Sequence, residues 1–438
     1  MKIIKIGTVV FTLLFNQLNA QEKNEACGTV VPGQAWDNWF NQKVEELKAG
    51  QIAGKTTFTN YTIPVIIHVI HGGEAVGTFP NLSLAQLNSQ IAVLNHDYAG
   101  TGYNTNTVPS VFANLIANTG VQFCMALKDP NGNTLAEPGI ERINCSSKGW
   151  TNPHSISNST NNTTFINYMD NTIKPASIWD PVKYLNIWVS DRPNGGLGLG
   201  YAMFPAGSGL SGITSGVGTS TNDGLWCWGQ CFGTTGTLAS GYDKGRVSSH
   251  EIGHYLGLRH IWGDANCASD YCSDTPPSQD ANYNCPTFPH NQGTCSGNTN
   301  GEMTMNIMDY TNDPCKYMFT PNQATRMQTA MANGTNRKLL GTHGLCSTIG
   351  IDANPDEVLL TSLTVFPNPS TGSFEVRFNH QDNTVYTIQL CDVLGCVVFS
   401  ESNRSSAYPG NFTVKEKGMY LLIVSSAKEK IVKKIIVE

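Results

Sequence analysis

Three histidines stand close together between residues 250 and 260, in the run HEIGHYLGLRH. His250 and His254 are four positions apart, so on a helix both imidazoles lie on one face and can bind the same ion. Gly257 can adopt a positive φ without steric cost, which lets the chain leave the helix sharply and bring back His260 as a third nitrogen ligand. Three protein ligands and one open position form a zinc site of the catalytic kind, because a water can fill the fourth position.

Glu251 follows the first of these histidines and lies beside the ion without having to bind it. Zinc lowers the pKa of a bound water, and a neighbouring carboxylate can take the water's proton and pass it to a leaving amine. We therefore expect hydrolysis by a zinc-activated water with Glu251 as the general base; that the bond is a peptide bond is implied by the family resemblance described below. Two alternatives stay open: a non-catalytic, adhesin-like surface-binding protein that retains the fold, and a zinc hydrolase of non-protein substrates. Binding alone would not require Glu251.

The N-terminal residues and the composition indicate an exported protein. Lys2 and Lys5 precede an apolar run from Ile6 to Phe15, which predicts a secretory signal peptide over residues 1–20. A formal net charge of −6 argues against a nucleic-acid-binding face, and no later apolar run is long enough to predict a transmembrane segment. The 13 cysteines suit an oxidising compartment, and their odd number leaves at least one thiol without an intramolecular partner. We expect a secreted monomer, either extracellular or attached to the cell surface.

Hydrophobic periodicity predicts how the chain is organised. Helical patterns fall at residues 35–47, 82–94, 247–258 and 321–331, with Asn81 or Ser83 as the cap of the second helix. Strand patterns fall at residues 62–71, 184–190 and 200–205, and the proline that ends the last suits a sheet edge. The predicted segments are a short lead at 21–58, which the resemblance described below makes a propeptide, a catalytic domain at 59–347, a linker at 348–362 and a C-terminal domain at 363–438. In this last domain, short alternating strands between turn residues predict a small all-β sandwich.

Further motifs surround the histidine run, and together they carry a family resemblance. The histidines, Gly257 and Met308 resemble the metzincin metallopeptidases. Other runs resemble the pappalysin family: WGD at 262–264, DTP at 274–276, MDYTNDPC at 308–315, FTPNQ at 319–323, YLNIW at 184–188 and GYAMFP at 200–205. The resemblance covers roughly residues 60–346. It implies a metzincin-like α+β catalytic domain, with a mixed twisted sheet, a zinc helix and a loop-rich lower part, that cleaves peptides extended along the edge strand near residues 200–205.

The resemblance also implies roles for residues near the zinc. Met308 would form an apolar floor under the imidazoles, and Tyr310 would hydrogen-bond the reaction intermediate unless it only packs in the wall. Asp313 would lie beside the pocket and favour Arg or Lys just after the scissile bond, although the sequence around it also reads as a turn.

Calcium is implied in the loop after the zinc helix. Asp270, Asp274 and the carbonyl of Thr275 would supply the hard oxygen ligands that calcium prefers. Without the resemblance these residues would read as turn acids.

The cysteines offer several pairings. The family's spacing implies disulfides Cys267–Cys295 and Cys285–Cys315, which would staple the long loop before Met308. Proximity alone suggests two further pairs, Cys124 with Cys145 and Cys227 with Cys231.

Cys27 lies in the lead, the predicted propeptide at residues 21–58, before the catalytic domain begins. A thiolate there can occupy the open zinc position and keep the enzyme latent until the lead is removed, as the resemblance to pappalysins and other metzincins implies. Alternatively, Cys27 pairs with Cys346 or Cys272.

The C-terminal domain carries a separate resemblance, to the sorting domain of the type IX secretion system. The runs that carry it are FPNPSTG at 366–372, VLG at 393–395, GMY at 418–420 and KKIIV at 433–437. It implies the type IX secretion machinery as a partner; the alternative is an accessory β-sandwich for carbohydrate binding or adhesion.

Overall fold

The computed structural model describes residues 27–54, 58–156, 163–196, 198–207, 213, 215–293, 295–346, 363–378, 385–392, 397–405, 410–414, 416–425 and 430–438. The chain divides into two compact units, Met1–Ser347 and Thr348–Glu438, which are described separately. The predicted signal peptide at 1–20 and the linker at 348–362 lie outside the described residues.

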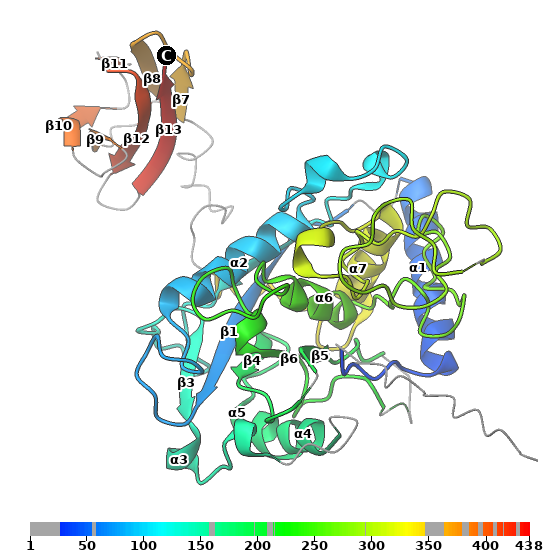
Figure 1. Cartoon of the computed structure of the whole chain (residues 1–438). Coiled ribbons are helices and arrows are strands. Elements are labelled where there is room, and N and C mark those ends of the chain that lie inside the picture. The colour runs from blue at the N-terminus through cyan, green and yellow to red at the C-terminus, as the bar shows by residue number, and fades with distance from the viewer. Residues whose placement is uncertain are drawn as a thin grey trace, which may run out of the picture. The chain divides into compact units, whose positions relative to one another are not determined.

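A six-stranded sheet forms the centre of the first unit (Figure 1). Its strand order is β2-β1-β4-β6-β5, and β3 also pairs with β1. Neighbours run parallel except β5, which is antiparallel to β6 and lies at one edge, as expected for residues 200–205. The strands are β1 (Tyr61–His71), β2 (Val121–Met125), β3 (Ile140–Asn144), β4 (Leu185–Ser190), β5 (Gly200–Ala202) and β6 (Leu225–Trp228). β4 is buried throughout, as expected for a central strand of a parallel sheet.

Four longer helices accompany this sheet: α1 (Gln34–Ile52), α2 (Leu84–Tyr98), α6 (Arg246–Tyr255) and α7 (Pro321–Asn333). Ser83 caps α2, since its hydroxyl accepts a hydrogen bond from the backbone N–H of Gln86 at 3.2 Å. Thr320 opens α7 with a capping box. α6 packs against α2, β5 and β6, which places the histidine run beside the sheet edge (Figure 1).

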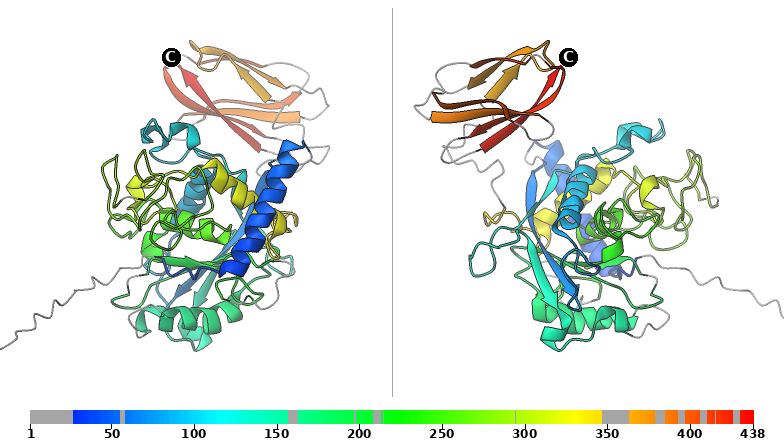
Figure 2. Two further views of the ribbon diagram at one scale, coloured as in Figure 1. Left: turned by 90° about the vertical axis from the view of Figure 1, so that its right-hand side faces the viewer. Right: turned by 60° about the vertical axis from the view of Figure 1, so that its left-hand side comes forward.

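Loops join α6 to α7. In the described part of residues 256–320, the only helical turn is Asp313–Cys315, and Figure 2 shows these yellow-green loops on the far side of α6 from α4 and α5. The predicted loop-rich lower part is therefore present. Short helices complete the unit: α3 (Cys145–Lys148), α4 (Thr163–Tyr168) and α5 (Lys174–Ser177).

The disulfide bonds correct part of the sequence interpretation. The structure contains Cys267–Cys295 and Cys285–Cys315, the two pairs that the resemblance implies. The third bond joins Cys124 to Cys346, so the pairing of Cys124 with Cys145 is wrong. Cys227 and Cys231 are both free thiols, so that pairing is also wrong.

The sheet explains the error at Cys124. β2 and β3 pair with different halves of β1: Cys124 lies opposite Pro64, whereas Asn144, just before Cys145, lies opposite His71. Seven strand residues separate these positions by roughly 23 Å, far more than a disulfide can bridge. Cys346 instead follows a chain segment that returns to β2, where Ala126 and Cys346 form an isolated bridge.

In the described part of the second unit, seven strands form two antiparallel sheets with the orders β10-β9-β12-β13 and β11-β8-β7. Phe374 and Phe412 from one sheet and Leu390 and Leu422 from the other share one core, as expected for a small sandwich. The strands are β7 (Leu363–Phe366), β8 (Ser373–Phe378), β9 (Val385–Cys391), β10 (Val397–Ser405), β11 (Gly410–Thr413), β12 (Gly418–Ser425) and β13 (Lys430–Val437).

Within the described residues, no helix combines the length and the apolar character needed to cross a membrane.

Candidate metal centre

Three buried imidazoles converge at the end of α6. The Nε2 atom of His254 lies 3.2 Å from that of His250 and 3.1 Å from that of His260. His250 and His254 share one face of α6, and the chain turns back at Gly257, whose φ is +87°. This turn brings His260 to the other two, as the sequence predicts.

Each imidazole is fixed through its other nitrogen. His250 Nδ1 donates to the carbonyl of Ile307 and His254 Nδ1 to that of Leu258, both at 2.8 Å. His260 Nδ1 bonds the carboxylate of Asp264. Protons held on Nδ1 leave the Nε2 lone pairs free to bind a metal.

Burial favours the neutral forms of His250 and His254. It lowers the pKa of His250 well below its usual value and the pKa of His254 to about 3. Neutral, oriented imidazoles with converging Nε2 atoms are the donor set that zinc requires, so these residues fit the ion.

The lead supplies a fourth donor to the same place. Cys27 Sγ and the three histidine nitrogens all lie within 4.8 Å of one another. Neither Cys346 nor Cys272 pairs with Cys27, because Cys346 bonds Cys124 and Cys272 is a free thiol. The structure therefore brings the predicted latency residue to the three predicted ligands.

Glu251 receives the contacts of the lead at the site and is almost fully buried. Burial raises its pKa to about 8. Its Oε2 atom accepts hydrogen bonds from the hydroxyl of Thr29 at 3.0 Å and from the thiol of Cys27 at 3.4 Å. Thr29 is a site residue that sequence reasoning missed, although it stands only two positions after Cys27.

The lead lies along the edge strand. Cys27 and Gly200 form a parallel bridge, and the N–H of Gly28 donates to the carbonyl of Gly200 at 2.9 Å. The N–H of Ala202 donates to the hydroxyl of Thr29 at 2.9 Å. The lead thus occupies the edge that the sequence analysis assigns to a substrate.

A second anchor connects the lead to a ligand histidine. Arg259 donates to both carboxylate oxygens of Asp37 in α1, at 3.0 and 2.8 Å. The same guanidinium donates to Asp264 at 2.9 Å, and Asp264 in turn holds His260. Asp264, four positions after His260, is thus an orienting residue, whereas the sequence analysis gives it no site role.

Met308 and Tyr310 border the histidines. Met308 is fully buried, and its sulfur lies too close for Gly253 to carry a Cβ without displacing it. The Tyr310 ring lies 4.8 Å from His260 and 5.7 Å from His250, centroid to centroid. The structure brings both predicted residues to the site.

The close approach at Gly253 gives a prediction. Gly253→Ala should lower the free energy of unfolding by about 1–3 kcal/mol, because the methyl group overpacks the floor against Met308. A lower melting temperature and weaker zinc retention would be measured by calorimetry and by metal analysis after dialysis. Gly33→Ala is the matched control, since a methyl there meets no atom within 4 Å. Equal melting temperatures for both variants would contradict the prediction.

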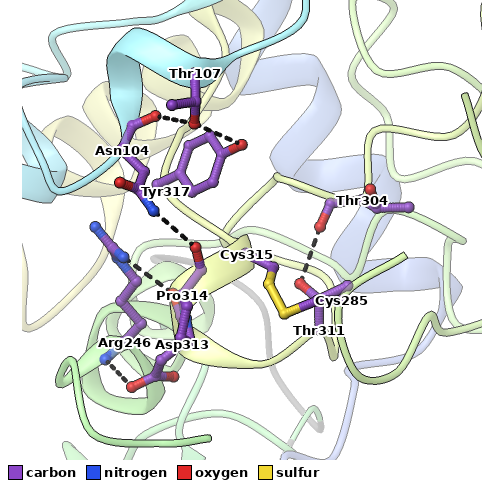
Figure 3. Close-up of a disulfide and its surroundings, with 10 residues drawn as sticks. All are labelled: Asn104, Thr107, Arg246, Cys285, Thr304, Thr311, Asp313, Pro314, Cys315 and Tyr317. Carbon is purple, nitrogen blue, oxygen red and sulfur yellow. Dashed lines mark hydrogen bonds between the residues drawn. A yellow bond between two sulfur atoms is a disulfide. The ribbon is translucent and has the colours of Figure 1, made fainter. Parts of the chain in front are cut away.

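Asp313 has a structural task at the start of α6 (Figure 3). Its Oδ2 atom accepts from the backbone N–H of Lys244 at 3.0 Å and of Arg246 at 3.1 Å. It therefore caps the first turn of α6 from a distant segment, which Cys285–Cys315 fixes. Burial raises its pKa, and among the described residues its Oδ1 atom has no hydrogen-bond partner. Asp313 is fully buried and does not line the cavity beside Glu251.

That cavity has a cation in its wall. The residues that line it together with His250 and Glu251 include Tyr242, Val247, Tyr310 and Lys316. Sequence reasoning missed Lys316, since a lone lysine after a turn carries no motif.

The predicted calcium ligands lie in the loop after α6. Asp270 is buried, which raises its pKa to about 7, and its oxygens accept from the N–H of Cys272 and the hydroxyl of Thr275. Both oxygens of Asp274 are used at the start of α7, by the hydroxyl of Thr320 and the N–H of Asn322. Asp270 and Thr275 are thus brought together, while Asp274 caps a helix.

Comparison with known proteins agrees with this geometry. A family model described as pregnancy-associated plasma protein-A matches residues 167–332, and one described as a secretion system C-terminal sorting domain matches residues 364–438. An extracellular metalloprotease of Verticillium alfalfae is 27% identical over 288 residues, which are 65% of this chain and 80% of that protein.

Two solved structures are also similar. Mature mirolysin of Tannerella forsythia, in complex with a cleaved peptide, is 35% identical; the match covers 65% of this chain and 97% of that one, with a TM-score of 0.53. A mutant promirolysin of the same organism is 31% identical; the match covers 72% and 97%, with a TM-score of 0.55. The chain therefore belongs to the pappalysin family, as a secreted zinc metalloprotease with a C-terminal secretion sorting domain.

Proposed function

We propose that His250, His254 and His260 hold the zinc of an endopeptidase and that Glu251 is its general base. The single observation that carries this is the convergence of three Nε2 atoms beside the Glu251 carboxylate. When bound, zinc supplies a Lewis acid that polarises the scissile carbonyl and eases the deprotonation of water. Glu251 takes the proton of the attacking water on a carboxylate oxygen and passes it to the leaving amine nitrogen.

The substrate would add to the edge strand β5. The lead supports this, because its backbone already hydrogen-bonds Gly200 at that edge. Tyr310 would donate its hydroxyl to the oxyanion of the intermediate, which its place beside His250 and His260 supports.

The lead, residues 21–58, would keep the enzyme latent. Cys27 places its sulfur with the three ligand nitrogens, and a thiol that binds a metal is deprotonated. Thr29 at the same time occupies the general base. Removal of the lead would therefore free the zinc position, the base and the edge strand together.

Asp313 would favour Arg or Lys just after the scissile bond. What supports this is a carboxylate close enough to the cavity to contribute to the raised pKa of its wall residue Tyr242, after the larger effects of burial and of Cys231. The preference would come from the negative charge of Asp313 acting at a distance, because Asp313 itself does not line the cavity.

Calcium would bind through Asp270 and the carbonyl of Thr275, with Asp274 as the weaker candidate. The buried charge of Asp270 supports this, since a cation would stabilise it. We expect millimolar calcium to raise the melting temperature by a few degrees, as for any ligand that binds only the folded state. Asp270→Asn should abolish the increase and Asp274→Asn should reduce it less; an equal increase in all three proteins would count against the site.

Residues 363–438 would address the chain to the type IX secretion machinery and then be removed, with 59–347 as the protease domain. The match of the sorting-domain model to residues 364–438 supports the start of the C-terminal domain at residue 363. Protein or peptide substrates and the secretion machinery are thus the proposed partners.

Zinc removal tests the proposed function directly. We expect a chelator to abolish cleavage of a peptide library, and an equimolar amount of zinc, but not of calcium, to restore it. Metal content would be measured on the same samples. Undiminished cleavage by protein shown to be free of zinc would overturn the proposal.

A further inference from the structure

β5 is the edge strand that the lead occupies and that a substrate would occupy, yet it has only three residues, Gly200–Ala202. In the sheet order it comes last, next to β6. Its other side is thus open to an added chain. A strand held by three residue pairs on one side is easily displaced, so contacts from outside the sheet decide how firmly it can bind a peptide.

The two faces of β5 meet different parts of the molecule. A Cβ at Gly200 would meet the Glu251 side chain at 2.7 Å, so this face of the strand lies against α6 and the zinc site. Successive strand residues point to opposite faces, which directs the Tyr201 side chain to the other side of the strand, where α4 and α5 lie (Figure 1). Tyr201 is almost fully buried there. Its side chain therefore holds the strand from the face opposite the zinc.

A buried ion pair receives Tyr201. Asp170 lies in the π-helical turn Met169–Ile173 between α4 and α5, and Lys174 is the first residue of α5. The Tyr201 hydroxyl donates to Asp170 Oδ1 at 2.7 Å, and Lys174 Nζ lies 2.8 Å from the same oxygen. The ammonium also lies 4.1 Å from the centroid of the Tyr201 ring. Single π-helical turns inside helices are frequent at functional sites.

These contacts are strong ones. A hydrogen bond to a carboxylate is about twice as strong as one between neutral groups, and an ammonium over an aromatic ring adds a cation–π attraction. Lys174 is fully buried, and its Nζ also lies 5.2 Å from the ring centroid of Trp188 in β4. Such an ammonium holds its carboxylate firmly, because loss of the partner would leave a buried charge uncompensated. Lys174 thus fixes Asp170, and Asp170 fixes Tyr201.

β5 transmits this order to the chain that binds it. The Gly200 carbonyl accepts from the N–H of Gly28 at 2.9 Å. The Ala202 N–H donates to the hydroxyl of Thr29, also at 2.9 Å. These two backbone groups stand on either side of Tyr201, so a displacement of Tyr201 moves both. A substrate at the same edge would use the same two groups.

We infer that Asp170 and Lys174 are positioning residues for peptide binding, which act through Tyr201 to fix the edge strand. The inference rests on the proposed function and gives the face of β5 opposite the zinc a part in it. Neither residue touches the reacting atoms, because α6 with its histidines lies on the other face of the strand. Their effect therefore falls on binding and not on the chemical step.

Tyr201→Phe tests the inference, because it removes the hydroxyl that Asp170 accepts and leaves the ion pair with Lys174 intact. In the zinc-loaded enzyme freed of its lead, we expect KM for an extended peptide to rise about tenfold and kcat to stay within about twofold, as for an interaction that substrate and transition state share. In the intact chain, the amides of Gly28 and Ala202 should exchange their hydrogens about tenfold faster, measured by mass spectrometry.

A double-mutant cycle tests whether Asp170 acts through Tyr201. Asp170→Asn should raise KM by at least as much as Tyr201→Phe, and the double variant should raise it no further than Asp170→Asn alone. Fully additive effects would overturn this link. If Asp170→Asn does not fold, because it leaves the Lys174 ammonium unpaired, the single variant Tyr201→Phe still decides.

Tyr184→Phe is the matched control. The buried Tyr184 hydroxyl donates to the carbonyl of Lys128 at 3.0 Å, and Lys128 follows β2 at the opposite edge of the sheet from β5. This variant should change neither KM nor the exchange of the two amides. Native KM and native exchange in Tyr201→Phe, or the same changes in Tyr184→Phe, would overturn the inference. Hydrogen exchange does not depend on turnover, so a trimmed native protein that cleaves no peptide would count against the proposed function alone.

Discussion

Glu251→Gln is expected to lower kcat/KM for peptide hydrolysis about 10⁴-fold, the upper range for a general acid–base residue. The reason is that glutamine keeps the shape of the side chain but can no longer accept the proton of the attacking water. Zinc content should not change, because the three Nε2 atoms converge without Glu251. The measurement pairs initial rates on a peptide library with metal analysis of the same samples, after the lead has been removed.

The control separates loss of chemistry from loss of the site. His254→Ala should abolish activity and zinc binding together, because His254 Nε2 lies next to both other ligand nitrogens. If Glu251→Gln retained activity within a few-fold of the native enzyme, the assignment of the general base would be wrong. If it lost zinc as well, Glu251 would be needed for the metal site itself.

The sequence predicts the local elements of this site well. Spacing alone places His250 and His254 on one helix face, and the requirement for a turn at Gly257 brings in His260. The edge position of the strand predicted at residues 200–205 is also correct, because a short apolar run that ends at proline tolerates only an edge, although β5 covers only Gly200–Ala202. These predictions succeed because each depends on neighbours within a few residues.

Contacts between distant segments are what the sequence does not reveal. Cys124 bonds Cys346, 222 residues away, because the last loop of the unit returns to β2. Asp313 caps α6 across 67 residues, so a residue that reads as a turn acid becomes the support of the zinc helix.

Short strands are a second feature that the sequence does not predict. The strands β2, β3 and β6 were not predicted, since each has only four or five residues and no clear alternation. Their pairing with β1 or β4 supplies the stability that their own sequences do not indicate.

Latency gives the second large effect. A full chain with its lead intact should be about 100-fold less active than the trimmed enzyme, because the lead is tethered at the site and rebinds at a high effective concentration. Cys27→Ala should remove most of this inhibition, since it takes away the fourth donor beside the three histidine nitrogens. Initial cleavage rates must be measured before the lead is removed, and mass spectrometry would show that the lead is still attached.

Variants at Thr29 and Asp37 test whether the inhibition comes from the Cys27 sulfur alone or from the lead as a folded segment. Thr29→Val removes the hydrogen bonds to Glu251 and to Ala202, and should raise the activity of the intact chain several-fold even with Cys27 present. Asp37→Asn should act in the same direction, because it weakens the bidentate pair with Arg259 that anchors α1. If only Cys27→Ala released activity, the sulfur alone would account for latency.

The matched control is Cys145→Ala, which removes another buried free thiol at α3, away from the histidines. It should leave the intact chain as inactive as before. Equal activity of the intact and trimmed native proteins would refute latency altogether, and equal activation by Cys27→Ala and Cys145→Ala would show that the change acts through stability. The expected order of activity in intact chains is therefore Cys27→Ala above Thr29→Val, with Cys145→Ala no higher than the native protein, because only the first two touch the zinc site and its base.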